Sequence, residues 1–304
     1  MSDNKPKLHH IGTGFCGTVW AAKDEQSTFK REDGGPHRSL TNDYNTHTLK
    51  PTSRSRHATT SSPHPTSGGM TASIDSHRTI SPCNTIHAHR IPPIAEPTRR
   101  LLTERYCPKH LVFEIMKSQT NRDLIRPYLG RCRVQTTSSH SGFTAFSLRN
   151  YPLHIDQMEE LGIPEQAIFE YARIMADALA TMHWIGEVDG NDVEFVLAAS
   201  NCNSNEITNA LGPHQMWLLD FDLVRPMTMD EQGVQQAVKA FLGDDPFDPQ
   251  PDESAIWEAF REQYLVTSSH CMLASGKGRA GLMNLHELFI HSVEASGVGQ
   301  TTRT

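Results

Sequence analysis

Two acidic segments in the second half of the chain carry residues that could do acid–base chemistry. The first places Asp189, Asp192 and Glu194 close together and then runs into an apolar stretch. The second is an apolar stretch that ends in Asp220 and Asp222. Carboxylates at the ends of buried strands can accept a proton, bind a divalent cation or pair with a guanidinium. A solvated turn would explain the acids alone, but not the apolar stretches beside them.

A glycine-rich segment near the N-terminus, followed by a lysine, could handle an anion. Gly12, Gly14 and Gly17 have the spacing found in two kinds of phosphate-binding loop, a strand-to-helix turn and a strand-to-strand flap. The β-branched and aromatic run at 18–21, a polar turn and a second short run ending at Lys30 favour the flap. Lys30 then stands where an ammonium can reach a bound anion. In isolation, each feature would be typical of an ordinary surface hairpin.

The order of these residues along the chain predicts a protein-kinase-like fold. A glycine-rich hairpin, Lys30, Asp189 and Asp220 follow the order of the flap, strand lysine, catalytic loop and metal-binding aspartate of kinases. There are two departures from that pattern. Glu194 occupies the place of the metal-binding asparagine, and Asp222 replaces the glycine of the Asp-Phe-Gly segment, which removes a backbone hinge.

Composition and spacing predict an α+β chain with two lobes. A β-rich first lobe is expected from 1–50 and 90–153, and a helical second lobe with the acidic loop from 154–304. The stretch 51–89 is rich in Ser, Thr, Pro, His and Arg, and we expect a disordered insert there. A strand is predicted within 143–153. Helices are predicted at 41–44, 164–183, 230–242 and 252–265.

The six cysteines are scattered without a Cys-x-x-Cys pair, and no apolar leader opens the chain. Reduced thiols, a cytoplasmic location and no membrane association are therefore expected. Cys107 and His110 are too few for a four-ligand zinc site.

A basic segment lies at 97–134 in a chain whose net charge is −7. Nine basic residues outnumber three acidic ones there, a local excess of six charges. Such a surface could hold a nucleic-acid backbone, with strong salt dependence. From charge alone, a pair of solvated helix faces is the simpler interpretation. The basic residues are Arg99, Arg100, Arg105, Lys109, Lys117, Arg122, Arg126, Arg131 and Arg133.

Several segments together resemble a fungal family whose members have been labelled hypothetical or zinc-finger proteins. The family includes the arginine-containing cyclodipeptide synthases of secondary-metabolite clusters. The resemblance covers most of the chain outside 51–89, and its most specific parts are NDVEF at 191–195 and LDFD at 219–222. The segments are 30–35 (KREDGG), 90–93 (RIPP), 125–131 (IRPYLGR), 147–153 (SLRNYPL), 191–197 (NDVEFVL) and 217–222 (WLLDFD).

The resemblance implies condensation of arginyl-tRNA with a second aminoacyl-tRNA to a cyclo-arginine-Xaa diketopiperazine. No cofactor is required at this step because the ester is already activated, although Mg²⁺ binding stays open. The implied partners are the two charged tRNAs and the tailoring enzymes of a biosynthetic cluster. The candidate catalytic residues are Asp189, Asp192, Glu194 and Asp220, with Asp189 first as general base. The candidate substrate-binding residues are Gly12, Gly14, Gly17, Lys30, Asp222, Arg126, Arg131 and Arg149.

Two other classes of function remain open at this point. An ATP- and Mg²⁺-dependent phosphotransferase would place Lys30 on the phosphates and use Glu194 and Asp220 as metal ligands. A pseudokinase-like binding module without turnover would explain the departures from the kinase pattern. Nucleotide binding would favour the former, and any cyclic dipeptide product would exclude the latter.

Overall fold

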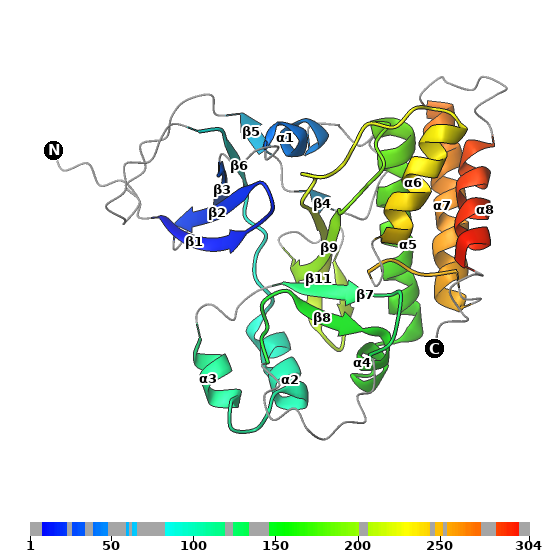
Figure 1. The fold of residues 1–304 in the computed structure, drawn as a ribbon. Coiled ribbons are helices and arrows are strands. Elements are labelled where there is room, and N and C mark those ends of the chain that lie inside the picture. Colours follow the sequence, from blue (N-terminus) through cyan, green and yellow to red (C-terminus); the bar gives the residue numbers. More distant parts are fainter. Residues whose placement is uncertain are drawn as a thin grey trace.

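The computed structural model shows an α+β fold with a small N-terminal sheet, a second sheet and a helical C-terminal part (Figure 1). In Figure 1 the second sheet lies between the first sheet and the helices α5 to α8. The structure describes residues 8–22, 26–33, 39–47, 59–60, 63–65, 83–118, 124–133, 146–200, 206–243, 247–251, 254–274 and 284–297.

The first sheet is antiparallel and has the strand order β1-β2-β3-β6-β5. The pairing of β2 with β3 confirms the hairpin that brings Lys30 into the sheet, and the helix α1 (Thr41–His47) confirms the short helix expected at 41–44. The strands are β1 (Leu8–Thr13), β2 (Gly17–Ala22), β3 (Ser27–Glu32), β5 (Pro63–Pro65) and β6 (Thr85–His89).

The strand β6 corrects the boundary of the insert expected at 51–89. Its backbone pairs with β3, and Ile86 packs with Cys16 and Leu40 in a small core. A short apolar anchor inside a polar stretch is enough to add a strand when a sheet edge is free to receive it. The short strands β4 (Thr59–Thr60) and β5 also lie in this stretch. The rest of the expected insert lies outside the described residues.

The second sheet has the order β10-β11-β9-β7-β8, with β4 paired to β11. The strands β7 and β8 come from the stretch 90–153, which was expected to extend the first lobe. Instead, β7 pairs with β9 and β8 pairs with β7, because the apolar residues of both strands belong to the large core of the C-terminal part. The bounds are β7 (Ile125–Tyr128), β8 (Tyr151–His154), β9 (Glu194–Ala199), β10 (Ile207–Asn209) and β11 (Gly212–Leu219).

The helical part confirms the predicted C-terminal helices. The long helix α5 continues into a π-helical turn, η1, before the acidic loop, and α7 and α8 pack beside α5 and α6. The helix α8 has no counterpart among the predictions. The helices are α2 (Glu96–Tyr106), α3 (Val112–Lys117), α4 (Ile155–Glu160), α5 (Glu165–Thr181), η1 (Met182–Gly186), α6 (Glu231–Gly243), α7 (Ala255–Ala274) and α8 (Leu285–Gly297).

Three simpler expectations can be compared with the described residues. None of their helices is long and apolar enough to cross a membrane. Among their cysteines, Cys16, Cys83, Cys107 and Cys271 are free thiols. Of the strand expected within 143–153, residues 143–145 lie outside the described residues; from 146 on, the strand begins at Tyr151.

Candidate functional site

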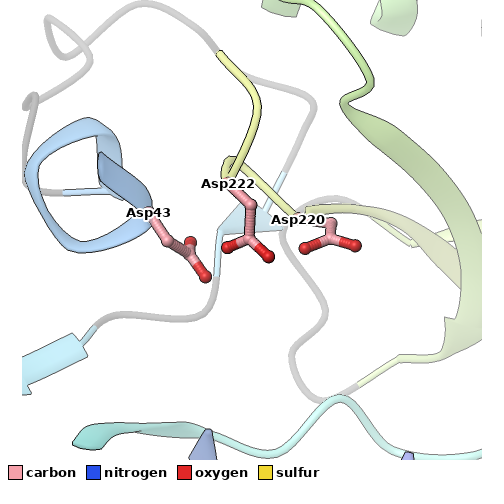
Figure 2. Close-up of side chains that lie close together, drawn as sticks. All are labelled: Asp43, Asp220 and Asp222. Atoms are coloured by element: carbon pink, nitrogen blue, oxygen red, sulfur yellow. The ribbon is translucent and has the colours of Figure 1, made fainter. Parts of the chain in front are cut away.

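Lys30 lies at the centre of three aspartates that come from distant parts of the chain. Its Nζ donates to Asp43 at 2.7 Å, to Asp220 at 2.8 Å and to Asp222 at 2.8 Å. Figure 2 shows the three carboxylates turned toward one another, one from α1 and two from the segment after β11. A lysine ammonium has three N–H donors, so all of them are used within the protein.

The charges of this cluster do not balance. Burial alone would lower the pKa of Lys30, but the carboxylates of Asp43, Asp220 and Asp222 outweigh burial and raise it, so the ammonium stays charged. Burial also raises the pKa of Asp222, and the Lys30 ammonium only partly opposes that effect. Three carboxylates around one ammonium leave an excess of negative charge in the place where a kinase-like site holds phosphates.

The glycine-rich loop folds down onto the same cluster. A Cβ added at Gly14 would lie 3.7 Å from Asp220 Oδ2 and 3.8 Å from Lys30 Cε. The backbone N–H of Cys16 donates to Asp222 Oδ2 at 3.2 Å. Gly17 serves the hairpin instead, because a Cβ there would lie 2.0 Å from the carbonyl oxygen of Arg31. The loop therefore gives a backbone donor to an internal carboxylate.

The helix α1 is fastened to the segment that carries Asp220 and Asp222. The side-chain amide of Asn42 donates to the backbone oxygens of Phe221, Asp222 and Val224. Because Asn42 and Asp43 are neighbours on α1, one short helix fixes both the backbone of this segment and the lysine ion pair.

A second group of charged residues lies on the other side of Asp220. Arg126 from β7 donates through Nη2 to Glu194 Oε1 at the start of β9. Burial raises the pKa of Glu194 to about 7; Arg126 opposes the shift, while Asp220 and Asp192 add to it. Partial desolvation and Asp220 likewise raise the pKa of Asp192. A carboxylic acid that titrates near neutrality is suited to proton transfer.

Asp192 and Asp220 adopt left-handed backbone conformations, with φ of 62° and 65°. Non-glycine residues rarely take this conformation, and such strain tends to gather at functional sites. Both aspartates are thus held where the strands β9 and β11 meet the first sheet, at a cost in backbone energy.

Asp189 does not join these carboxylates, contrary to its expected role as general base. Its side chain is 0% exposed and accepts four hydrogen bonds, which matches the capacity of a carboxylate. Oδ1 accepts from the backbone N–H groups of Asn191 (3.1 Å) and Arg225 (2.9 Å). Oδ2 accepts from Arg225 Nε (2.8 Å) and Gln236 Nε2 (2.9 Å). This geometry leaves no lone pair for a substrate, and Asp189 instead fastens the acidic loop to the segment around Arg225.

The structure brings seven of the twelve predicted residues together: Gly14, Lys30, Arg126, Asp192, Glu194, Asp220 and Asp222. Gly12 and Gly17 shape the hairpin. Arg131 and Arg149 are exposed on the loops that follow β7 and precede β8. Sequence reasoning missed Asp43 and Asn42, although their place in a short helix between β3 and the low-complexity stretch matches the kinase helix that supplies an acid to the strand lysine.

Divalent metal does not fit the cluster as the side chains are arranged. Within the described part of the chain, Asp43, Asp220 and Asp222 are the one group whose ligand atoms come within 4.8 Å of one another. The Lys30 ammonium donates to all three and takes the place of a cation. A metal would have to displace it.

These features together define a protein-kinase-like α+β fold in which the strand lysine and the glycine-rich loop bond to the protein's own acids. Comparison with known proteins adds one family: residues 216–276 match the family DUF3669, described as "Zinc finger protein". Among the residues described, no Cys and His cluster accompanies that description. No curated protein sequence matches the chain.

Solved structures of two different thermostable mutants of the aminoglycoside phosphotransferase APH(4)-Ia show a low similarity to this chain. The ternary complex with AMP-PNP and hygromycin B is 11% identical in sequence, with a TM-score of 0.22. The alignment covers 98% of this chain and 95% of the phosphotransferase chain. The complex with ADP and hygromycin B has 9% identity and a TM-score of 0.19, with 96% and 95% covered. The fold assignment rests on the element order and the contacts of Lys30.

Proposed function

We propose that this protein condenses an arginyl group and a second aminoacyl group, both delivered as tRNA esters, into a cyclo-arginine-Xaa diketopiperazine. The observation that carries the proposal is an acidic kinase-like site in which the groups that would bind phosphate are already used. The three N–H groups of the Lys30 ammonium donate to Asp43, Asp220 and Asp222, and the backbone N–H of Cys16 in the loop donates to Asp222. A nucleotide triphosphate would meet carboxylates there.

The same site is suited to a cationic substrate. Among the described residues, Asp192 has no hydrogen-bond partner, and Glu194 and Asp220 each bond through a single oxygen, Oε1 and Oδ1. A guanidinium offers five N–H donors in a planar fork that matches carboxylates in pairs. Arginine can therefore bind where a phosphate would be repelled.

The chemistry needs a proton acceptor and two activated esters. Glu194 takes a proton from the α-ammonium of one aminoacyl group, and the neutral amine attacks the ester carbonyl carbon of the other. A C–N bond forms, the C–O ester bond breaks, and the new amide nitrogen loses a second proton. Of the two protons, one goes to the departing ribose oxygen and the other to solvent. The free amine of the resulting dipeptidyl ester then attacks the remaining ester in the same way, which closes the ring and releases the second tRNA. No oxidant and no ATP enter the balance.

Two further points support this proposal. The family model covers 216–276, which includes the LDFD segment of the resemblance, and its description carries the zinc-finger label that such proteins have. The exposed basic residues Arg100, Arg105, Lys109 and Lys117 lie on or between α2 and α3, where they can contact a tRNA backbone. A supply of charged tRNAs also suits a cytoplasmic enzyme.

A phosphotransferase is the second candidate, and one observation favours it. Asp43, Asp220 and Asp222 have the ligand type and closeness that Mg²⁺ needs, provided that Lys30 turns away. Nucleotide-dependent stabilisation of the protein in the presence of Mg²⁺ would support this candidate over the synthase.

The test is expression in a host that supplies charged tRNAs, followed by mass spectrometry for arginine-containing diketopiperazines. A lysate reaction with and without RNase serves as the control for the tRNA donor. We expect the product to disappear with RNase and to fall at least tenfold in Glu194→Gln and in Asp192→Asn. A product that persists after RNase treatment, or no cyclic dipeptide from the folded wild type, refutes the proposal.

A further inference from the structure

Arg126 is held firmly between an acid and an aromatic ring. Its Nη2 donates to Glu194 Oε1, and its guanidinium carbon lies 5.9 Å from the centroid of the Phe247 ring. Phe247 is fixed in turn, because its backbone oxygen accepts from the N–H of Leu129 at 3.0 Å and its ring meets Tyr128 edge-on at 4.7 Å. The guanidinium therefore has little freedom to move away from Glu194.

Stability alone does not explain this pair. Arg126 Nε is buried and has no hydrogen-bond partner among the described residues. The two side chains are only 20% and 23% exposed. Burying both charges and leaving a buried guanidinium N–H unpaired costs free energy that one ion pair offsets poorly. Such an unsatisfied group in a native fold calls for a functional explanation.

We propose that Arg126 is a positioning residue that orients the Glu194 carboxylate, leaving its second oxygen to take the proton of the substrate ammonium. The proton transfer rests on the proposed function, but the orientation and ionisation of Glu194 do not. Arg126 Nη2 donates to Glu194 Oε1, so Oε2 is the Glu194 oxygen without a described hydrogen-bond partner. The Phe247 ring, 5.9 Å from the guanidinium carbon, limits the movement of the guanidinium away from Oε1.

The charges that face Glu194 give this arrangement a measurable consequence. They are Arg126 from β7, Asp192 from the loop before β9 and Asp220 from the segment after β11. Burial and the two aspartates raise the pKa of Glu194, and Arg126 is the cation that opposes them. Without Arg126 the pKa must rise further, and the carboxyl would hold its proton at neutral pH.

The experiment compares Arg126→Gln, Arg126→Lys and wild type in a carboxyl ¹³C NMR titration. Protein with labelled glutamate is used, and the Glu194 signal is assigned by its loss in Glu194→Gln. We expect the apparent pKa of Glu194 to rise by one unit or more in Arg126→Gln and to return most of the way to the wild-type value in Arg126→Lys. Phe247→Leu, which keeps the charge but loosens the guanidinium, should broaden the signal and shift it less.

The matched control is Arg261→Gln, which removes the same charge from an arginine that pairs with Glu258 and Glu294. It should leave the Glu194 titration unchanged. In cyclodipeptide formation, the acidic limb of the pH profile should move upward with the pKa in Arg126→Gln, so that raising the pH recovers product. A Glu194 pKa that stays within 0.3 units of wild type in Arg126→Gln overturns the inference. If the folded wild type makes no cyclic dipeptide, the proposed function fails, whereas the titration still decides the role of Arg126.

Discussion

Replacing Asp189 by asparagine separates a structural role for this residue from a catalytic one. The substitution keeps the shape but turns one carboxylate oxygen into an NH₂ group. If that group replaces Oδ2, it faces Arg225 Nε and Gln236 Nε2, which donated at 2.8 and 2.9 Å. Two acceptor bonds are lost inside a side-chain site that is 0% exposed.

The magnitude follows from those two bonds. A hydrogen bond to a charged group contributes about 1.5–3 kcal/mol, and Arg225 belongs at the lower end because its side chain is 54% exposed. We expect Asp189→Asn to lower the free energy of unfolding by about 3 kcal/mol. For a chain of this size, that corresponds to a drop in Tm of about 6 °C.

The assay combines thermal unfolding, followed by circular dichroism, with cyclodipeptide formation well below the Tm of the variant. The control is Glu262→Gln, which removes a carboxylate charge from an exposed side chain of α7 and should unfold at nearly the wild-type temperature. Product per folded molecule should stay within a fewfold of wild type in Asp189→Asn. A variant that unfolds like wild type but makes no product would refute this reasoning and restore Asp189 as the base.

Three further predictions concern the cluster and the glycine-rich loop. Lys30→Met should lower the free energy of unfolding in urea by about 3–5 kcal/mol, because three close carboxylates lose their cation. The loss should be larger at pH 8 than at pH 6. Adding Asp222→Asn should restore part of the lost stability. In the folded protein the pKa of Glu194 is raised from 4.5 to about 7. The protonated Glu194 side chain therefore contributes its full stabilisation below pH 4.5, and this stabilisation is lost as the pH rises to 7. Glu194→Gln should remove this change of the unfolding free energy with pH, which amounts to at most about 3 kcal/mol. If the unfolding free energy of the variant changes with pH as in the wild type, the pKa shift is contradicted. Gly17→Ala should clearly lower the Tm measured by calorimetry. Gly14→Ala should not, because a Cβ at Gly14 makes only ordinary contacts. Equal Tm values for the two variants would contradict the strand geometry at Gly17.

The sequence predicted the elements that depend on local pattern. The hairpin before Lys30, the helix that became α5 and the apolar strands beside the two acidic segments all formed, because periodicity and β-branched runs set them within a few residues. The correct order of Lys30 and Asp220 also brought those two residues together.

What the sequence did not predict depends on contacts between distant segments. Asp43 looked like any acid in a short polar helix, and only its ion pair with Lys30 makes it part of the site. Asp189 matched a catalytic position by spacing, but Arg225, 36 residues later, and Gln236 enclose it. The strands β7 and β8 joined the second sheet because their apolar residues pack in the large core, which no local pattern in 90–153 could reveal.

The residue that links the fold to the proposed chemistry is Asp222. In the kinase pattern this position is glycine, and the strand lysine and the glycine-rich loop are left to bind phosphate. Here the Asp222 carboxylate accepts from both Lys30 Nζ at 2.8 Å and the loop N–H of Cys16 at 3.2 Å. One internal anion thus takes two of the donors that a phosphate group would use. Because those donors are satisfied, while Asp192 and one oxygen each of Glu194 and Asp220 have no described hydrogen-bond partner, we propose that the site favours a cation over a nucleotide.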